Sequence, residues 1–255
     1  MTVEVTLYPP ESHAFGQFDG GNIREQKPIG FPGERGAVTR IGPLFYWAWF
    51  EGEGLIPAHP HQAFEIVTYV LSGRVEHRDN LGFHSVVGTG GAQVLQAGSG
   101  AVHEERLIDI ITQGFQIWCE PYYRDALKRA PAYACYEPDV FPLQERNGAC
   151  VRTVIGEGSP IALAAECAMQ DILLQPGASF AFDIPPGYAV AALALEGRGT
   201  MEGTAGIIDV AARDFVVARS GSGGKLRIVA ERDNGLRFFS VAVPECVDYP
   251  VYNKG

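Results

Sequence analysis

Residues 59–82 read HPHQAFEIVTYVLSGRVEHRDNLG, and residues 98–105 read GSGAVHEE. Both stretches place short apolar and β-branched runs between glycines, which is typical of β-strands. The rest of the 255-residue chain shows the same pattern, with 31 glycines and 17 prolines between similar runs. This pattern predicts an all-β sandwich or barrel. The expected strands are Leu44–Phe50, Phe64–Leu71, Arg74–Arg78, Ala92–Gln96, Phe115–Cys119, Cys150–Ile155, Ala168–Leu174, Ser179–Asp183, Ala189–Leu195, Ile207–Val210, Phe215–Ala218, Lys225–Ala230 and Arg237–Val243, with one helix at Tyr122–Arg129.

Histidines occur at alternate positions in the two quoted stretches. In a strand, residues i and i+2 project from the same face. His59 and His61 therefore point one way, and His103 and Glu105 do the same from a second strand, with Glu104 turned away. Two such strands facing each other predict a metal site with three nitrogens and one carboxylate. That ligand set suits iron, nickel, copper, cobalt, manganese or zinc.

A short motif suggests that one unit is duplicated. VLSGR at residues 70–74 is echoed by ALEGR at residues 194–198, and each is followed by a turn, a strand and a Ser-Gly pair. The proline-rich and polar residues 131–148 would join the two halves. We therefore expect two domains, at residues 1–130 and 131–255.

The two halves differ in chemistry. All six histidines lie at or before His103. Counting back from Gly197, the counterparts of His59, His61 and Glu65 are Asp183, Pro185 and Ala189. The second domain is therefore expected to lack metal ligands, and to serve as structure or as a pocket wall.

Composition excludes several classes of function. The formal net charge is −10 and no basic run occurs, which argues against direct nucleic-acid binding and against adsorption to anionic membranes. No signal peptide or transmembrane run is evident, so the expected compartment is the cytoplasm. The five cysteines are scattered and odd in number, as expected for reduced and mostly buried thiols.

The two histidine stretches resemble the motifs of the cupin superfamily, and more closely the signature of the pirin family. Similar pirin-like stretches are IGPLFYWAW at 41–49, GFQIWCEP at 114–121, PAYACYEPDVFP at 131–142 and the glycine-rich residues 16–34. The resemblance implies two tandem cupin (jelly-roll-type) β-barrels, a bicupin, with a metal only in the N-terminal barrel.

The family's ligands correspond to His59, His61, His103 and Glu105 in this sequence. Generic cupins use the glutamate of the first motif instead, here Glu65. We expect Glu105 to be the ligand and Glu65 to lie next to the site, with Glu65 as the competing ligand.

The sequence departs from the pirin pattern beside the expected ligands. Gln62-Ala63 stands where pirins have Arg-Gly after HPH, and Glu104 stands where they have serine. These changes are expected to alter the mouth of the pocket and its charge.

Aromatic and polar side chains are candidates for a pocket next to the metal. Trp47 shares a face with Trp49 and Phe45, and with Phe64 and Trp118 it is expected to line an aromatic pocket, unless these side chains simply pack the core. Gln116 alternates with Trp118 and is a candidate hydrogen-bond donor to a ligand. His77 precedes a turn and is expected on the surface.

The ligand set and the resemblance together predict the chemistry. Three histidines and one carboxylate leave open positions on one divalent ion, for which we favour Fe(II) over Ni, Mn, Co, Cu or Zn. A flavonol or catechol-type aromatic would bind there with dioxygen, and Glu105 would act as the catalytic base, as in quercetin-cleaving pirins. The alternatives are a non-catalytic regulatory pirin with transcription-related protein partners, and a cupin that binds a small molecule without chemistry.

Overall fold

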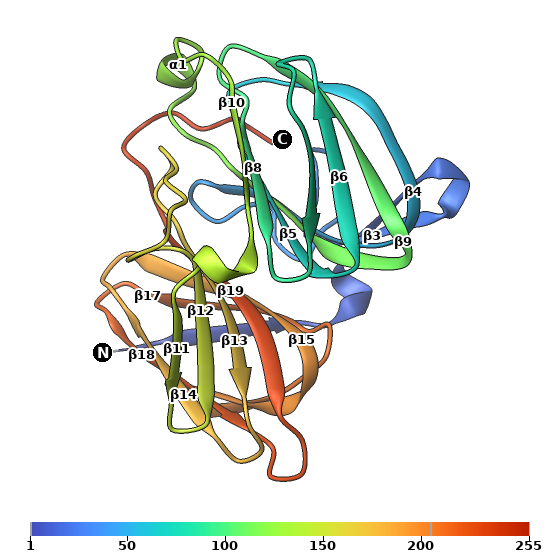
Figure 1. Ribbon diagram of the computed structural model, residues 1–255. Helices are drawn as coiled ribbons and strands as arrows, with labels where there is room; N and C mark the ends of the chain where they lie inside the picture. The colour runs from blue at the N-terminus through green and yellow to red at the C-terminus, as the bar shows by residue number, and fades with distance from the viewer. Residues whose placement is uncertain (1, 205, 255) are drawn as a thin grey trace. The chain divides into compact units, whose positions relative to one another are not determined.

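The computed structural model describes residues 2–204 and 206–254 and divides them into two compact units (Figure 1). We call the unit formed by residues 13–140, 163–166 and 248–254 the N-terminal barrel. The unit formed by residues 2–12, 141–162 and 167–247 is called the C-terminal barrel.

The N-terminal barrel is built from antiparallel strands in the order β10-β8-β5-β9-β4-β3-β2, and β6 pairs with β7 and β9. Its α1 helix covers Tyr123–Ala126, and short 3-10 turns occupy Asp19–Gly21 and Pro138–Val140. The strands are β2 (Ala14–Phe18), β3 (Ile23–Ile29), β4 (Leu44–His61), β5 (Glu65–Ser72), β6 (Arg74–Asp79), β7 (His84–Gly88), β8 (Ala92–Gln96), β9 (Ala101–Cys119) and β10 (Ala132–Tyr136).

The C-terminal barrel repeats this arrangement in the order β1-β17-β15-β19-β13-β12-β11. In addition, β14 pairs with β18, and both β16 and β18 pair with β15. A 3-10 turn at Pro10–Ser12 follows its first strand. The strands are β1 (Glu4–Tyr8), β11 (Leu143–Arg146), β12 (Ala149–Ile155), β13 (Ala168–Leu174), β14 (Ser179–Ile184), β15 (Tyr188–Gly203), β16 (Gly206–Ala211), β17 (Phe215–Ser220), β18 (Gly224–Ala230) and β19 (Leu236–Pro244).

The two strand orders correspond position by position, which supports the predicted duplication. The turn glycines Gly73 and Gly197 both have positive φ, at 74° and 82°. A Cβ on Gly197 would lie 1.8 Å from the carbonyl oxygen of Gly235, so only glycine fits there. The all-β fold is confirmed, and each expected strand overlaps a strand of the structure.

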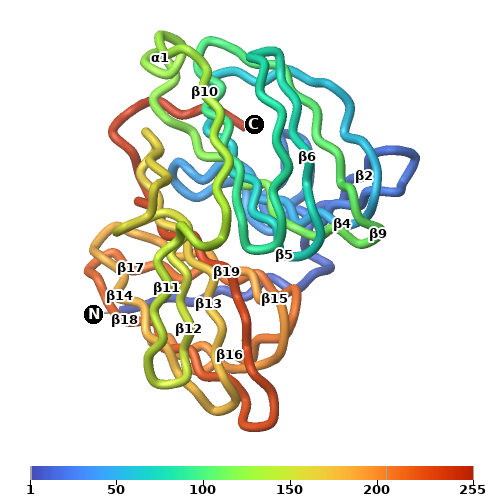
Figure 2. Tube along the Cα trace, viewed as in Figure 1, coloured from blue at the N-terminus to red at the C-terminus, as the bar shows by residue number. Residues whose placement is uncertain are grey.

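Each barrel has an edge strand that comes from the other half of the sequence. Strand β1, from the start of the chain, pairs with β17 in the C-terminal barrel, where its blue trace lies among orange strands (Figure 2). Strand β10, after residue 130, pairs with β8 in the N-terminal barrel. A boundary between residues 130 and 131 would therefore separate β10 from the sheet to which it is hydrogen-bonded.

The interiors of the two barrels differ in polarity. The C-terminal barrel encloses a continuous apolar cluster that includes Phe182, Met201, Leu226 and Phe238. The N-terminal barrel has smaller apolar clusters and buries His61, His77, His103, Glu65 and Glu105. Among the described residues, no helix is long and apolar enough to cross a membrane.

Candidate metal centre

Strands β4 and β9 bring the three predicted histidines together. The two strands run antiparallel beside each other (Figure 1). In their register His59 is directly opposite His103. The ring nitrogens of His59, His61 and His103 all lie within 4.8 Å of one another. His61 and His103 are buried, whereas His59 is half-buried. This cluster could hold one metal ion.

The hydrogen bonds and charges of these rings suit metal binding. The Nδ1 of His59 lies 2.7 Å from the carbonyl oxygen of Pro57 and donates to it, so the Nε2 is the ring nitrogen available to a metal ion. The Nε2 atoms of His61 and His103 are 2.9 Å apart. Two nitrogens that are each about 2.1 Å from one ion, at a right angle, would be roughly 3.0 Å apart. Burial lowers the pKa of both His61 and His103 to about 3, so the rings are neutral, as metal ligands must be.

Glu105 is buried two residues beyond His103 in β9, as strand parity predicts. Its Oε1 accepts hydrogen bonds from Thr68 Oγ1 (3.1 Å) and Gln93 Nε2 (2.6 Å), and its Oε2 accepts one from Gln116 Nε2 (2.6 Å). In the part of the chain that the structure describes, the cluster of mutually close ligand atoms contains the three histidines and not Glu105. The carboxylate is thus held beside the histidines by amide and hydroxyl donors.

Glu65, at the position where generic cupins have a metal ligand, is hydrogen-bonded to a backbone segment in this structure. Its carboxylate accepts the backbone N–H groups of Ala164 (2.9 Å) and Ala165 (2.8 Å), and the Nε2 of Gln96 (2.6 Å). Residues 163–166 belong to the N-terminal barrel although the chain on either side belongs to the other unit. Glu65 therefore anchors this returning segment.

A cavity of about 390 Å³ opens next to His59 and His61. Three aromatic rings form a packed wall, since Phe31 stacks on Tyr46 at 4.2 Å and meets Trp118 edge-on at 5.0 Å. The lining residues are Phe18, Glu25, Phe31, Tyr46, Ile56, Pro57, Ala58, His59, His61, Glu105, Gln116 and Trp118.

The predicted pocket residues are only partly those observed. Gln116 and Trp118 line the cavity, but Trp47 does not, because it packs edge-on against Phe115 on the other side of its strand. A register shift between Ile56 and His59 changes the parity of the strand, so Tyr46 shares the face of His59 and His61 and lines the cavity instead. Phe64 is not part of the lining, and its ring packs 5.4 Å from that of Trp118.

The structure adds Glu25, which the sequence analysis missed. Burial raises the pKa of this carboxyl above its ordinary value, and Tyr46 donates to it at 3.2 Å. Lys27 lies 3.6 Å from Glu25 and 2.6 Å from Glu34, so an ion-pair network reaches the cavity wall. Burial alternates along β3 at Ile23, Glu25 and Lys27, but charged residues stand at two of these positions, so the sequence shows no apolar alternation there.

His77 is not the surface histidine that its position before a turn predicted. Its side chain is 1% exposed, and it alternates with buried Val75 and buried Asp79 along β6. The ring of Tyr133, from β10, stacks on it at 3.8 Å with 9° between the planes. His77 also reaches the Nδ1 of His103, at 3.2 Å.

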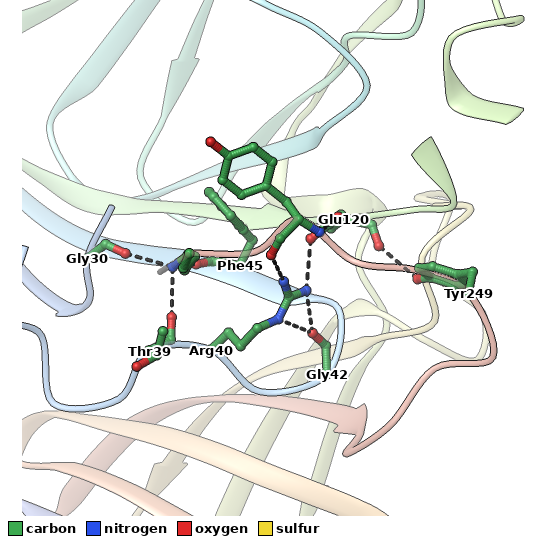
Figure 3. A network of polar contacts seen from close by, with 9 residues as sticks. Gly30, Thr39, Arg40, Gly42, Phe45, Glu120 and Tyr249 are labelled. Atoms are coloured by element: carbon green, nitrogen blue, oxygen red, sulfur yellow. Dashed lines mark hydrogen bonds and ion pairs between the residues drawn. The ribbon is translucent and has the colours of Figure 1, made fainter. Parts of the chain in front are cut away.

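A network of polar contacts holds the C-terminal segment, residues 248–254, within the N-terminal barrel (Figure 3). The guanidinium of Arg40 donates to the carbonyl oxygens of Gly42 and Tyr252 and to Glu120. Lys254 donates to the carbonyls of Gly30, Thr39 and Phe45, and its Nζ lies 4.2 Å from the centre of the Phe45 ring. Because Phe45 packs on Phe64 and Trp118, this segment supports the wall from behind.

Two of the departures from the pirin pattern now have a structural meaning. Ala63, where pirins have glycine, adopts a left-handed backbone with φ 68°. Gln62 is exposed and donates to the carbonyl of Ser99 at 3.1 Å. Glu104 is half-buried and faces away from the histidines, as its parity requires.

Comparison with known proteins agrees with this geometry. The family model described as Pirin matches residues 49–119. A pirin-like protein of Caulobacter vibrioides is 33% identical over 177 residues, which cover 64% of this chain and 62% of that relative. A Pseudomonas aeruginosa protein provisionally named a quercetin 2,3-dioxygenase is 31% identical over 204 residues, or 72% of this chain and 70% of that protein. The matched part is thus less than two thirds of the Caulobacter relative.

Among solved structures, the bacterial pirin YhhW of Escherichia coli in complex with nickel(II) superposes with a TM-score of 0.78. The two chains are 20% identical, and the match covers 96% of this chain and 100% of YhhW. Two cupin-type barrels, one of them carrying a three-histidine cluster, define a bicupin. Within that class, the chain belongs to the pirin family.

Proposed function

We propose that the protein is a metal-dependent dioxygenase that opens the ring of a flavonol or catechol-type aromatic, with Fe(II) as its ion. One observation carries the proposal: the histidine cluster opens into a cavity with an aromatic wall and a hydrogen-bonded carboxylate, Glu105. A structural metal site would be closed, whereas a catalytic site keeps access for a substrate.

The cavity suits a flat aromatic substrate. Its volume of about 390 Å³ lies within the range of small-molecule sites. Trp118 and the stacked pair Phe31 and Tyr46 offer ring faces and edges against which an aromatic plane can pack. The same rings exclude water from the reacting groups.

Glu105 is proposed as the base that takes the proton of a substrate hydroxyl. A bound ion would acidify that hydroxyl and bring dioxygen to the same place, and a dioxygenase leaves both oxygen atoms in its products. Thr68, Gln93 and Gln116 fix the carboxylate, so little reorganisation is needed when the substrate arrives. We also propose that Glu105 completes the ligand set of His59, His61 and His103 when the ion is bound.

The test is anaerobic reconstitution with Fe(II), followed by quercetin and then oxygen. We expect the flavonol absorbance to fall as one dioxygen is taken up per flavonol. His61→Ala should lose both the metal and the turnover, and Glu105→Gln should lower kcat by about 10²-fold or more. His84→Ala, a change at an exposed histidine of β7, is the matched control.

Fully metallated wild-type protein that turns over no flavonol and no catechol would contradict the proposal. That result would direct the search toward a regulatory pirin and its protein partners.

A further inference from the structure

A chain of hydrogen bonds leads from the buried carboxylate of Asp79 to the Nδ1 of His103, the ring nitrogen that does not face His61. Strand β6 lies beside β9 with Asp79 opposite His103 and His77 opposite Glu105. The Nε2 of His77 is 2.9 Å from the Oδ2 of Asp79, and its Nδ1 is 3.2 Å from the Nδ1 of His103. The side chains of Asp79 and His77 are 0% and 1% exposed, so water does not compete for these bonds.

The proton positions in this chain follow from the acceptor at its end. The carboxylate of Asp79 accepts hydrogen bonds only, since its Oδ1 also takes the N–H groups of Leu81 and Phe83 at 2.9 Å each. The Nε2 of His77 must therefore carry the proton, which leaves the Nδ1 of a neutral His77 as an acceptor. His103 then donates through its Nδ1–H, and its Nε2 keeps a free lone pair. That lone pair is on the side where His61 lies, 2.9 Å away.

Packing holds the His77 ring in this orientation. The ring of Tyr133 lies flat against it, and the Tyr133 hydroxyl contacts Ser85 at 2.5 Å and donates to the Oε1 of Gln93 at 3.1 Å. Gln93 in turn uses its Nε2 to reach Glu105. One residue of the exchanged strand β10 thus steadies both the His77 ring and the amide that holds Glu105.

We propose that Asp79 and His77 are positioning residues that fix the tautomer and ring angle of His103, and so set the affinity of the histidine cluster for its metal. This proposal rests on the metal site of the proposed function, but not on the identity of the substrate or on turnover. A partner that orients the remote nitrogen of a ligating histidine typically accounts for about 10- to 100-fold in metal affinity.

Asp79→Asn is the sharpest variant. The asparagine keeps the size of the side chain, and its Oδ1 can still accept from Leu81 and Phe83. Its amide, however, presents N–H to the Nε2 of His77, which reverses every donor along the chain and moves the His103 proton to Nε2. His77→Phe keeps a ring for Tyr133 to stack on but removes both hydrogen bonds, whereas His77→Gln keeps an acceptor and a donor.

The experiment measures Co(II) and Ni(II) affinity by competition with a chromophoric chelator, together with the melting temperature of each metal-free variant. We expect Asp79→Asn and His77→Phe to lose about 10- to 100-fold in affinity. His77→Gln should recover part of that loss, and His84→Phe, the exposed control, should match the wild type. In the metal-free protein, ¹⁵N spectra of the imidazoles should place the His103 proton on Nδ1 in the wild type and on Nε2 in Asp79→Asn.

Folded Asp79→Asn and His77→Phe proteins that bind Co(II) within twofold of the wild type would overturn the proposal, as would a wild-type His103 protonated on Nε2. Failure of the metal site itself would look different, because the wild type would then bind no stoichiometric Co(II). Failure of the dioxygenase proposal would leave the affinities and the spectra unchanged.

Discussion

The two barrels share one strand order but not one interior. The C-terminal barrel is filled by apolar side chains such as Phe182, Ile184 and Ile228. The N-terminal barrel buries histidines and a glutamate at the same kind of inward position, and each is tied to a neighbour by a hydrogen bond. The comparison teaches that this fold tolerates buried histidines and carboxylates where they are hydrogen-bonded to one another and to neighbouring side chains.

The contrast is sharpest where the metal ligands would be expected in the second copy. By the same count that equates Gly73 with Gly197, the counterpart of His59 is Asp183. It lies opposite Lys225 in the register of β14 and β18, and the two form an exposed ion pair at 2.6 Å. An exposed ion pair contributes little to stability, so position 183 carries a solvated charge where the N-terminal barrel has a histidine of its cluster.

The largest expected effect on stability comes from replacing Glu65 by alanine, the residue at the corresponding position 189 of the C-terminal barrel. Glu65→Ala leaves the N–H groups of Ala164 and Ala165 without their acceptor. We expect a loss of about 2–4 kcal/mol in the free energy of unfolding, measured in urea. Metal bound per folded chain should not change, and Glu65→Gln, which keeps one acceptor, should lose less. Loss of metal at unchanged stability would show instead that Glu65 is a ligand.

A second pair of substitutions exchanges a residue between the barrels. Ala63 and its counterpart Gly187 both have a left-handed backbone, with φ 68° and 76°. A Cβ on Gly187 would meet no atom within 4 Å. Gly187→Ala should therefore lower the free energy of unfolding only through backbone strain in the left-handed conformation, by about 1 kcal/mol. Ala63→Gly should stabilise by about 0.5–1 kcal/mol, because relief of strain exceeds the added entropy of the unfolded chain. Effects of equal sign in the two barrels would contradict this reading.

The smallest effect concerns the C-terminal segment, which braces the N-terminal barrel. Burial lowers the pKa of Lys254 from 10.5 to about 8. Between these values the unfolded chain binds more protons than the folded one, so the contribution of Lys254 to stability rises with pH. The free energy of unfolding of the wild type, relative to that of Lys254→Met, should rise by about 0.5 kcal/mol per pH unit. This is less than the slope for the binding of one full proton, because the site is partly open to solvent.

Urea denaturation at pH 8, 9 and 10 measures this difference, with Lys225→Met in the C-terminal barrel as the matched control. A difference between wild type and Lys254→Met that stays flat or falls as the pH rises would exclude the assigned cause.

Local patterns predicted a good part of this molecule. Alternation along two strands placed His59, His61 and His103 together and turned Glu105 inward, because the period of a strand is short and strict. The echo of VLSGR in ALEGR found the duplication. The long strands β4, β9 and β15 were recognised only in part, since glycines within them look like turn signals in the sequence.

What the sequence did not reveal depends on distant partners. Tyr46 replaced Trp47 in the cavity because a register shift changed the parity of β4. His77 was expected at the surface because a polar residue before a turn is usually solvated, but the buried Asp79 gives it a partner inside. The exchange of β1 and β10 leaves no local trace, since any strand with suitable alternation can join an open edge.

That exchange also sets an order of events during synthesis. Glu4 of β1 pairs with Arg219, which is made much later, so β1 must wait for its neighbour β17 to be synthesised. Strand β10 instead follows its neighbour β8 after a short interval. Pairing between distant residues is slow to form, and waiting strands are open to wrong partners. The N-terminal barrel can therefore close most of its sheet early, whereas β1, which is made before it, is among the last strands to be paired.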